Sequence, residues 1–313
     1  MSESFRNYKY TTDMVELTYK KNHINQTLSY VLNFKKKYIL FPNISIKLWD
    51  ALLLLNTIID ESDPDSKIEQ INHAYQTSES IIRRYFNNRI NLTLNNNIKI
   101  VNLFSDSELK NIPNKYKHIY EKNTIKSMYN MDVWSWLPLI GLIHDLGKLL
   151  ILDDFGKLPQ WSVVGDTYPV GCSIEKGVIF SDKQFYKENK EYQKYNTKYG
   201  IYKKNCGFAK LNFTWGHDEY LYMVLKKNSN KLPKEGLYMI RYHSFYAWHT
   251  PQKNKTISYS HFASDYDWKM LPLLKILQKS DLYSKNPNLP PIKELEVYYK
   301  NLINKYFKET VLF

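Results

Sequence analysis

The segment LIGLIHDLGKLL, residues 139–150, has leucine or isoleucine on every side when it is drawn as a helix of 3.6 residues per turn. This pattern is typical of a helix inside a protein rather than one at its surface. His144, Asp145 and Lys148 would then be buried as well, and a buried charged group needs a partner because burial alone disfavours its charged form. The segment therefore predicts a central helix within residues 132–152 that carries a cluster of partnered polar groups.

Most of the remaining chain also has helical periodicity. We expect further helices within residues 13–40, 46–60, 68–86, 211–226, 234–247, 267–284 and 291–308. Residues 161–180 contain Gly, Asp and Pro at short intervals, which indicates turns and a short β-hairpin. The sequence predicts an all-α fold with one minor β element.

Residues 87–130 differ from the rest of the chain because they are rich in Asn and Lys and only weakly periodic. A stretch of such low hydrophobicity cannot sustain a core of its own. We interpret it as a surface insertion with some helix. Since no repeat or linker divides the chain, we expect one domain over residues 1–313 with this excursion.

The composition limits the classes of function. The net charge is +13, from 44 Lys and Arg against 31 Asp and Glu, but the lysines are scattered as on a solvated surface, so we expect no nucleic-acid binding. No run of about 18 apolar residues predicts a membrane span. The N-terminus is polar, and two cysteines are too few for a disulfide framework. We expect a cytoplasmic protein without a membrane partner, and a monomer.

The pair His144–Asp145 suggests a metal site. The two side chains are about 100° apart on a helix, and both can reach an ion that lies between them. Imidazole nitrogen and carboxylate oxygen suit iron, manganese or zinc, and a carboxylate can bridge two ions. Lys148, one turn later, would face an anionic or hydroxyl group beside the metal.

Other ligands must come from elsewhere in the chain. Taken singly, each remaining histidine fits a structural role, but together they indicate a metal centre. His73, His217 and His243 lie in apolar or amphipathic stretches, whereas the contexts of His23, His118 and His261 are those of surface residues and that of His249 is ambiguous. Asp281 follows an apolar helix, with Lys285 one turn later, so this pair is either a site element or an exposed ion pair.

The acidic stretch DESDPD, residues 60–65, follows a predicted helix, where carboxylates oppose the helix dipole. Asp63 before Pro64 favours a turn, and Asp65 or Ser66 can cap the next helix. Asp60, Glu61 and Ser62 have no such local explanation. Clustered acceptors of this kind could hold a polyhydroxylated ligand.

These motifs together resemble the myo-inositol oxygenases of the HD-domain superfamily. The matching segments are SFRNY (4–8), DESDPD (60–65), HAYQT (73–77), LIHDLGK (142–148), PQWSVVGDTYPVGC (159–172), WGHDEYLY (215–222), YMIRYHSFYAWHT (238–250) and DLYSK (281–285). They follow the family's order and span nearly the whole chain. The resemblance implies an HD-domain-like helical bundle that cleaves myo-inositol with dioxygen to D-glucuronate at a mixed-valent Fe(II)/Fe(III) centre.

The resemblance also implies a role for individual residues. The metal ligands would be His73, His144, Asp145, His217, His243 and Asp281, with Asp145 as the bridge. His73 and His144 would hold the iron that binds substrate, and His217, His243 and Asp281 the other iron. Lys148 would stabilise the substrate oxygen. The other residues at the polyol would be Asp60, Glu61, Ser62, Gly165, Asp166, His243, Ser244 and Lys285, with Arg6 in an N-terminal lid.

Two alternatives stay open at this point. Metal-dependent phosphohydrolases of the HD-domain superfamily share the His…His-Asp…Asp arrangement, and a basic chain with two metals would suit phosphate chemistry. An oxygenase for another polyol or an organophosphonate is also compatible. The chain departs from the family in the interval between His73 and His144, which is longer than usual. Long surface insertions cost little closure entropy, so the core can tolerate it.

Overall fold

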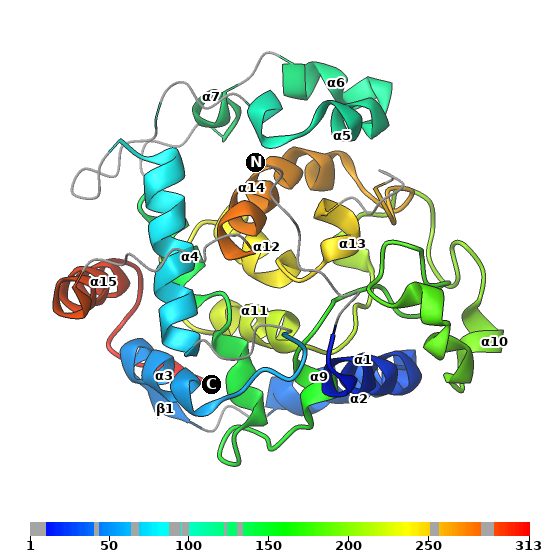
Figure 1. Cartoon of the computed structure of the whole chain (residues 1–313), viewed down its shortest axis with the longest axis horizontal. Helices are drawn as coiled ribbons and strands as arrows, with labels where there is room; N and C mark the ends of the chain where they lie inside the picture. The colour runs from blue at the N-terminus through cyan, green and yellow to red at the C-terminus, as the bar shows by residue number, and fades with distance from the viewer. Residues whose placement is uncertain are drawn as a thin grey trace.

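The computed structural model describes residues 11–40, 44–63, 69–87, 95, 100–121, 124–129, 134–250, 257–282 and 291–313. Arg6 and Lys285, which we predicted near the substrate, lie outside these residues, as do Pro64, Asp65 and Ser66. The described chain is predominantly helical (Figure 1).

The helices confirm the predicted all-α class. They are α1 (Asp13–Asn25), α2 (Leu28–Leu40), α3 (Leu48–Leu54), α4 (Gln70–Tyr85), α5 (Asp106–Asn111), α6 (Asn114–Glu121), α7 (Ile125–Tyr129), α8 (Trp136–Ile143), α9 (Gln160–Val163), α10 (Tyr192–Tyr195), α11 (His217–Lys227), α12 (Lys234–Tyr242), α13 (Tyr246–His249), α14 (Asp265–Asp281) and α15 (Ile292–Tyr306). The long helices begin and end close to the predicted limits. Residues 211–216, which we expected to be helical, precede α11 as a bend and irregular backbone with an isolated bridge at Phe213.

The minor β element is a two-stranded antiparallel sheet, but it lies elsewhere than expected. β1 (Ser45–Ile46) pairs with β2 (Val311–Leu312), so the sheet joins segments from opposite ends of the chain. Residues 161–180 form part of α9, turns and one isolated bridge between Pro169 and Phe213. Glycines in this stretch support turns instead of a hairpin: Gly165 and Gly171 have φ of 98° and 81°.

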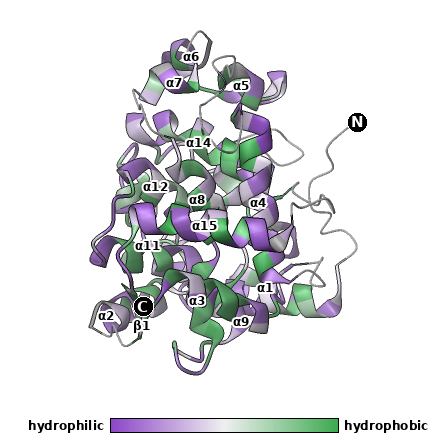
Figure 2. Ribbon diagram, turned by 90° about the vertical axis from the view of Figure 1, so that its left-hand side faces the viewer, coloured by the Kyte–Doolittle hydropathy of each residue, from purple (hydrophilic) through white to green (hydrophobic). Residues whose placement is uncertain are grey.

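Helix α8 occupies the interior, as its apolar sequence predicts. It packs against α4, α12, α14 and α15, and Figure 2 shows it as an apolar helix between these elements. Leu139, Ile140, Leu142 and Ile143 have no exposed surface. The four residues thus fix the centre of the fold, and the end of α8 lies where helices from distant parts of the sequence meet.

The predicted continuous helix over residues 132–152 is wrong in one respect. Helix α8 ends at Ile143, and the chain continues through Asp145 into a 3₁₀ helix, η4 (Leu146–Ile151). Gly147 lies so close to α11 that a Cβ atom there would be 1.8 Å from the carbonyl oxygen of His217. The tighter turn and this glycine let α11 approach the His144–Asp145 pair, which an uninterrupted helix with larger residues would prevent.

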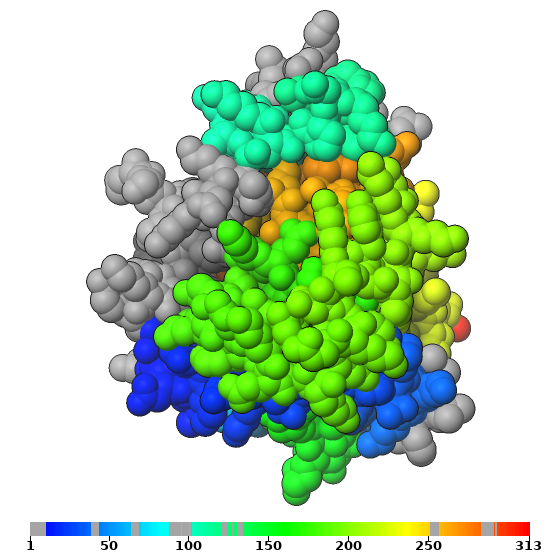
Figure 3. All heavy atoms as spheres, turned by 90° about the vertical axis from the view of Figure 1, so that its right-hand side faces the viewer, coloured from blue at the N-terminus to red at the C-terminus, as the bar shows by residue number. Residues whose placement is uncertain are grey.

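The described part of the predicted insertion packs onto α14. Helices α5, α6 and α7 lie together at one end of the molecule, and α14 is beneath them (Figures 1 and 3). Side chains from this segment join the main core: Ile100, Leu103, Phe104, Ile112, Tyr116, Tyr120, Ile125 and Tyr129. The stretch has a low overall hydrophobicity, but it contains several apolar and aromatic side chains that are buried in the core.

Within the described residues, no helix has both the length and the hydrophobicity needed to cross a bilayer.

Candidate metal centre

The predicted ligands come from five helices that are far apart in sequence. His73 is in α4, His144 and Asp145 follow α8, His217 begins α11, His243 follows α12 and Asp281 ends α14. Five of the six side chains lie at helix ends, where the backbone can turn towards a common point. All but His73 are buried, and His73 is half-buried.

One cluster contains His73, His144, Asp145 and Asp281. The Oδ1 atom of Asp281 is 2.8 Å from Nε2 of His73 and 3.5 Å from Nε2 of His144. The Oδ2 atom of Asp145 is 3.8 Å and 3.4 Å from the same two nitrogens. The structure therefore places Asp281 with His73 and His144. This corrects our expectation that Asp281 shares a metal with His217 and His243.

A second cluster contains His217, His243 and the other oxygen of Asp145. The Oδ1 atom of Asp145 is 3.5 Å from Nε2 of His217 and 3.7 Å from Nε2 of His243. The two Nε2 atoms are 3.0 Å apart. Since the two oxygens of Asp145 face different clusters, this carboxylate is placed to bridge two metal ions.

The backbone sets the orientation of three of the imidazoles. The Nδ1 atoms of His144, His217 and His243 lie 2.7–2.8 Å from the carbonyl oxygens of Gly141, Val163 and Ile240. A carbonyl only accepts, so each Nδ1 carries a proton and donates it to the backbone, and Nε2 is the ring nitrogen that faces the cluster. Metal-binding histidines are held in this way in proteins. The donor set of imidazole nitrogens and carboxylate oxygens fits iron, manganese or zinc.

Electrostatics keep the two carboxylates ionised. Burial opposes ionisation of Asp145, but the neighbouring His144 and Lys148 and a hydrogen bond from His243 hold its pKa well below the usual range. Burial likewise opposes ionisation of Asp281, while contacts with His144 and His73 hold its pKa well below normal. Burial lowers the pKa of His217 to about 3, so its ring stays neutral. Anionic oxygens and neutral nitrogens are the forms that bind metal.

Lys148 is buried beside the bridge. Its Nζ atom is 2.9 Å from Oδ2 of Asp145 and 2.8 Å from Oδ2 of Asp60, and it donates to Oε1 of Gln70 at 3.3 Å. Burial disfavours the ammonium, but the two carboxylates outweigh it and raise the pKa of Lys148. Lys148 is therefore a fixed positive charge, and no sequence motif indicated Gln70 as its third partner.

Part of the acidic stretch reaches this site. The Oδ1 atom of Asp60 accepts from the backbone nitrogen and the hydroxyl of Ser62 at 2.8 and 2.6 Å, while its Oδ2 atom contacts Lys148. Glu61 is half-buried, and Thr18 donates to its carboxylate at 3.4 Å. Asp60 and Glu61 also line a cleft of about 440 Å³ beside α1, which lies within the range of small-molecule sites, ~300–1,000 Å³.

The remaining predicted substrate residues divide into two groups. Ser244 joins the second cluster, because its Oγ atom is 3.1 Å from Nε2 of His217. Asp166 is buried, and its Oδ2 atom accepts from the backbone nitrogen of Ile179 at 2.9 Å. Burial raises the pKa of Asp166 well above its usual range. Gly165 precedes it with a positive φ and packs against the ring of Tyr19. Gly165 and Asp166 therefore stabilise the turn in which they lie.

A buried ion pair that sequence reasoning missed connects α11 and α12. The Nε and Nη2 atoms of Arg241 donate to the two carboxylate oxygens of Glu219 at 2.7 and 3.0 Å, and Lys35 is 3.0 Å from Glu219. Glu219 is two residues after His217, and Arg241 is two residues before His243. The pair therefore holds together the helices that supply the second cluster. The sequence signal for this pair was that Glu219 and Arg241 carry opposite charges and that each lies two residues from a candidate ligand.

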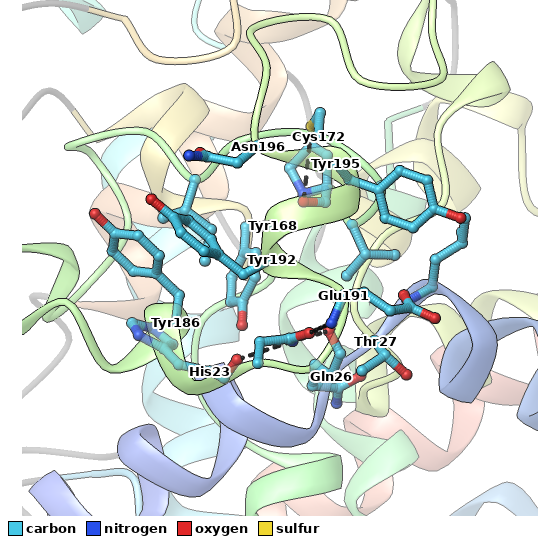
Figure 4. Close-up of a pocket in the computed structure, with 16 residues that line it drawn as sticks. His23, Gln26, Thr27, Tyr168, Cys172, Tyr186, Glu191, Tyr192, Tyr195 and Asn196 are labelled. Carbon is cyan, nitrogen blue, oxygen red and sulfur yellow. Dashed lines mark hydrogen bonds between the residues drawn. The ribbon is translucent and has the colours of Figure 1, made fainter.

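The other histidines only partly follow our expectations. His118 is exposed, as predicted, and His261 is half-buried beside Glu175. His23 was expected at the surface, but it is fully buried, and burial lowers its pKa to about 4. Its ring meets Tyr168 edge-on and lines a small cavity between α1 and residues 168–196 (Figure 4). The predicted site residues are not part of the lining of this cavity.

Comparison with known proteins identifies the family. The family model described as Myo-inositol oxygenase matches residues 12–102 and 87–313 of this chain. An inositol oxygenase of Dictyostelium discoideum is 41% identical over 313 residues, which cover 97% of this chain and 88% of that protein. The inositol oxygenase of Homo sapiens is 38% identical over 309 residues (97% and 88%), and inositol oxygenase 1 of Arabidopsis thaliana is 37% identical over 309 residues (97% and 82%). The chain therefore belongs to the myo-inositol oxygenase family.

Proposed function

We propose that the chain is an oxidoreductase that uses dioxygen to open the ring of myo-inositol and forms D-glucuronate. Two clusters of histidine and carboxylate ligands that share Asp145 are the observation that carries this proposal, together with membership of the family. The alternative of a phosphohydrolase has no support from the comparisons. Asp60 beside Lys148 also argues against it, because a buried carboxylate would repel a phosphate group.

We propose two iron ions as the cofactor. One would be held by His73, His144 and Asp281, the other by His217 and His243, and Asp145 would be shared. When bound, the iron pair would supply Lewis acidity and the redox chemistry with dioxygen that protein side chains cannot provide. The protein's part is to orient the substrate and to control protons and water around it.

The numbers of ligands suggest where the substrate binds. The first cluster offers four protein ligands, counting Asp145, whereas the second offers His217, His243 and Asp145. Two histidines and one carboxylate form the triad that leaves positions open in iron oxygenases. We therefore propose that myo-inositol binds at the His217–His243 cluster. This replaces our expectation that the substrate binds at His73 and His144.

Lys148 would hold a substrate oxygen. An ammonium group has three donors, and in the structure they face Asp145, Asp60 and Gln70. The contact with Gln70, at 3.3 Å, is the longest and the easiest to exchange for a substrate hydroxyl. The two carboxylates would keep Lys148 charged and in place. A fixed positive charge then stabilises negative charge that develops on the bound oxygen.

Polar groups around Lys148 suit a polyol, and the apolar groups behind it exclude water. We propose that Asp60, Ser62, His243 and Ser244 contact the substrate, with Arg6, Glu61, Gly165, Asp166 and Lys285 around them. Leu142, Ile143, Leu146 and Leu149 flank His144 and Asp145 in the sequence and have no exposed surface. Such an apolar shell strengthens the electrostatic interactions inside it and limits side reactions.

Product analysis tests this proposal. Iron-loaded protein incubated with myo-inositol in air should form D-glucuronate, identified by NMR, and omission of either iron or dioxygen should abolish it. Release of inorganic phosphate from a nucleotide under argon would support the hydrolase instead.

We further propose that the protein acts as a cytoplasmic monomer without nucleic-acid or membrane partners. Light scattering at micromolar concentration tests the monomer directly.

A further inference from the structure

A buried ion pair joins the segment 100–129 to the helix that ends at Asp281. Glu108 in α5 and Lys275 in α14 are 9% and 4% exposed, and their charged groups are in direct contact. Glu108 is also fixed within its own helix, because its carboxylate accepts from the backbone nitrogen of Ser105 at 2.7 Å. Among the described residues, Glu108 is the one carboxylate in ion-pair contact with Lys275.

Lys275 also contacts the chain that follows His243. Its Nζ atom donates to the carbonyl oxygen of His249 at 2.9 Å. The Nε2 atom of His249 is 2.8 Å from the carbonyl oxygen of His243, so this nitrogen carries the proton and donates. On the other side of the ring, Nδ1 lies 3.3 Å from the hydroxyl of Thr250, which can donate to it. Every polar atom of the His249 side chain is therefore used.

These contacts form a continuous path from Glu108 through Lys275 and His249 to His243. We infer that Glu108 is a positioning residue for the metal centre: it neutralises Lys275, which holds the backbone of His249 so that its ring fixes His243. This inference rests on the proposed metal site at His217 and His243. Half-satisfied buried networks are unfavourable, so loss of one charge should disturb the whole path.

Glu108 belongs to the segment that we predicted as a surface insertion. It lies in the interval between His73 and His144, which is longer than the resemblance to the family leads one to expect. Tyr116 in the same segment donates to the carboxylate of Asp265 at 2.6 Å, at the start of α14. The segment therefore contacts both the first turn and the middle of the helix that carries Asp281. We infer that these contacts help to hold α14, and with it Asp281, in place.

Metal binding by three variants tests the inference. Glu108→Gln keeps the size of the side chain but leaves Lys275 without a counter-charge. We expect the Kd of the metal ion at the His217–His243 cluster to rise at least tenfold. Glu108→Gln combined with Lys275→Met removes both charges and should return the Kd to within about threefold of the parent. Glu296→Gln, which breaks an exposed ion pair with Lys300, is the matched control and should change nothing. Titration with Zn²⁺ and with Fe²⁺ measures each constant without turnover.

His249→Phe provides a second route if Glu108→Gln does not fold. It removes the donor to His243 and leaves the ion pair intact, so the same loss of metal affinity is expected. Parent-like metal binding by either folded variant, or a double variant that binds no better than Glu108→Gln, overturns the inference. A parent protein that binds no metal would instead overturn the proposed function and this inference with it. The two failures are therefore distinguishable.

Discussion

The Nε2 atoms of His217 and His243 lie 3.0 Å apart in the interior, and each ring uses its Nδ1 proton on a backbone carbonyl. Both Nε2 atoms therefore face the same small region. A cation bound there would be held by both nitrogens, and the Oδ1 atom of Asp145, 3.5–3.7 Å from the two nitrogens, would be its third ligand. The geometry of the second cluster is thus arranged for a cation.

Metal should consequently stabilise the folded chain. A ligand at 100 times its Kd that binds only the folded state adds about 2.7 kcal/mol to the free energy of unfolding. We expect Fe²⁺ or Zn²⁺ to raise the unfolding midpoint of chelator-treated protein by several degrees. His217→Phe should reduce this shift, while His118→Phe, at an exposed helix position, should not. Differential scanning calorimetry measures both, and an unchanged midpoint in saturating metal would contradict the assignment.

Substitution of the carboxylates should separate the two clusters. Asp281→Ala removes a ligand of the His73–His144 cluster and should leave one metal ion per chain. Asp145→Ala removes the oxygens shared by both clusters and should leave fewer metal ions than Asp281→Ala. Elemental analysis after gel filtration gives the stoichiometry. Two tightly bound ions in the Asp145 variant would refute its role as the bridge.

Lys148→Met should separate metal binding from turnover. The variant retains all six proposed ligands, so both ions should stay bound. Loss of a fixed donor at a developing charge typically lowers turnover by about 10²–10³-fold, and we expect a decrease of that order. Lys157→Met, in an exposed pair with Asp153, is the control. Steady-state kinetics with equal metal content decide the question, and normal turnover would make Lys148 a structural residue only.

His23 should make the folded chain sensitive to acid. Its pKa is about 4 in the folded state because of burial, against 6.5 in the unfolded chain. The unfolded state therefore binds more protons between these values, and stability falls as the pH decreases through this window. This residue should cost about 2 kcal/mol of stability between pH 7 and pH 5. Urea unfolding at the two pH values should show the loss in the parent and a smaller one in His23→Phe.

Phe185→Leu is the matched control for His23→Phe, since Phe185 packs against the His23 ring but does not titrate. It should lower the free energy of unfolding equally at pH 7 and pH 5. An equal pH dependence in the parent and His23→Phe would show that His23 is not protonated on unfolding in this range.

Local sequence patterns predicted the helices, and the resemblance to the family supplied the full set of candidate ligands. The all-round apolar pattern of residues 139–150 identified the central helix, and the need of His144, Asp145 and Lys148 for partners followed from their burial. The structure confirms that these residues are buried, and it brings His73, His217, His243 and Asp281 to them. Five of the six candidate ligands lie at helix ends, and His73 lies within α4.

Properties that depend on contacts between distant segments were not predictable in the same way. The break after Ile143 depends on the approach of α11 to Gly147, which no local pattern records. The side on which Asp281 lies depends on the packing of α14 against α4. Pairing of β1 with β2 joins the two ends of the chain, and the burial of His23 depends on Tyr168 and Tyr186. Each is a tertiary effect that overrides local sequence.

We propose that the two clusters perform a dioxygen-dependent ring cleavage of myo-inositol. The decisive measurement is oxygen consumption by the iron-loaded protein, followed with an electrode while glucuronate is quantified in the same sample. Opening the ring of C₆H₁₂O₆ by one O₂ gives C₆H₁₀O₇ and water, so we expect one O₂ to be consumed for each glucuronate formed, and none without myo-inositol. Oxygen uptake that is independent of myo-inositol, or none in its presence with both metal ions bound, would contradict it.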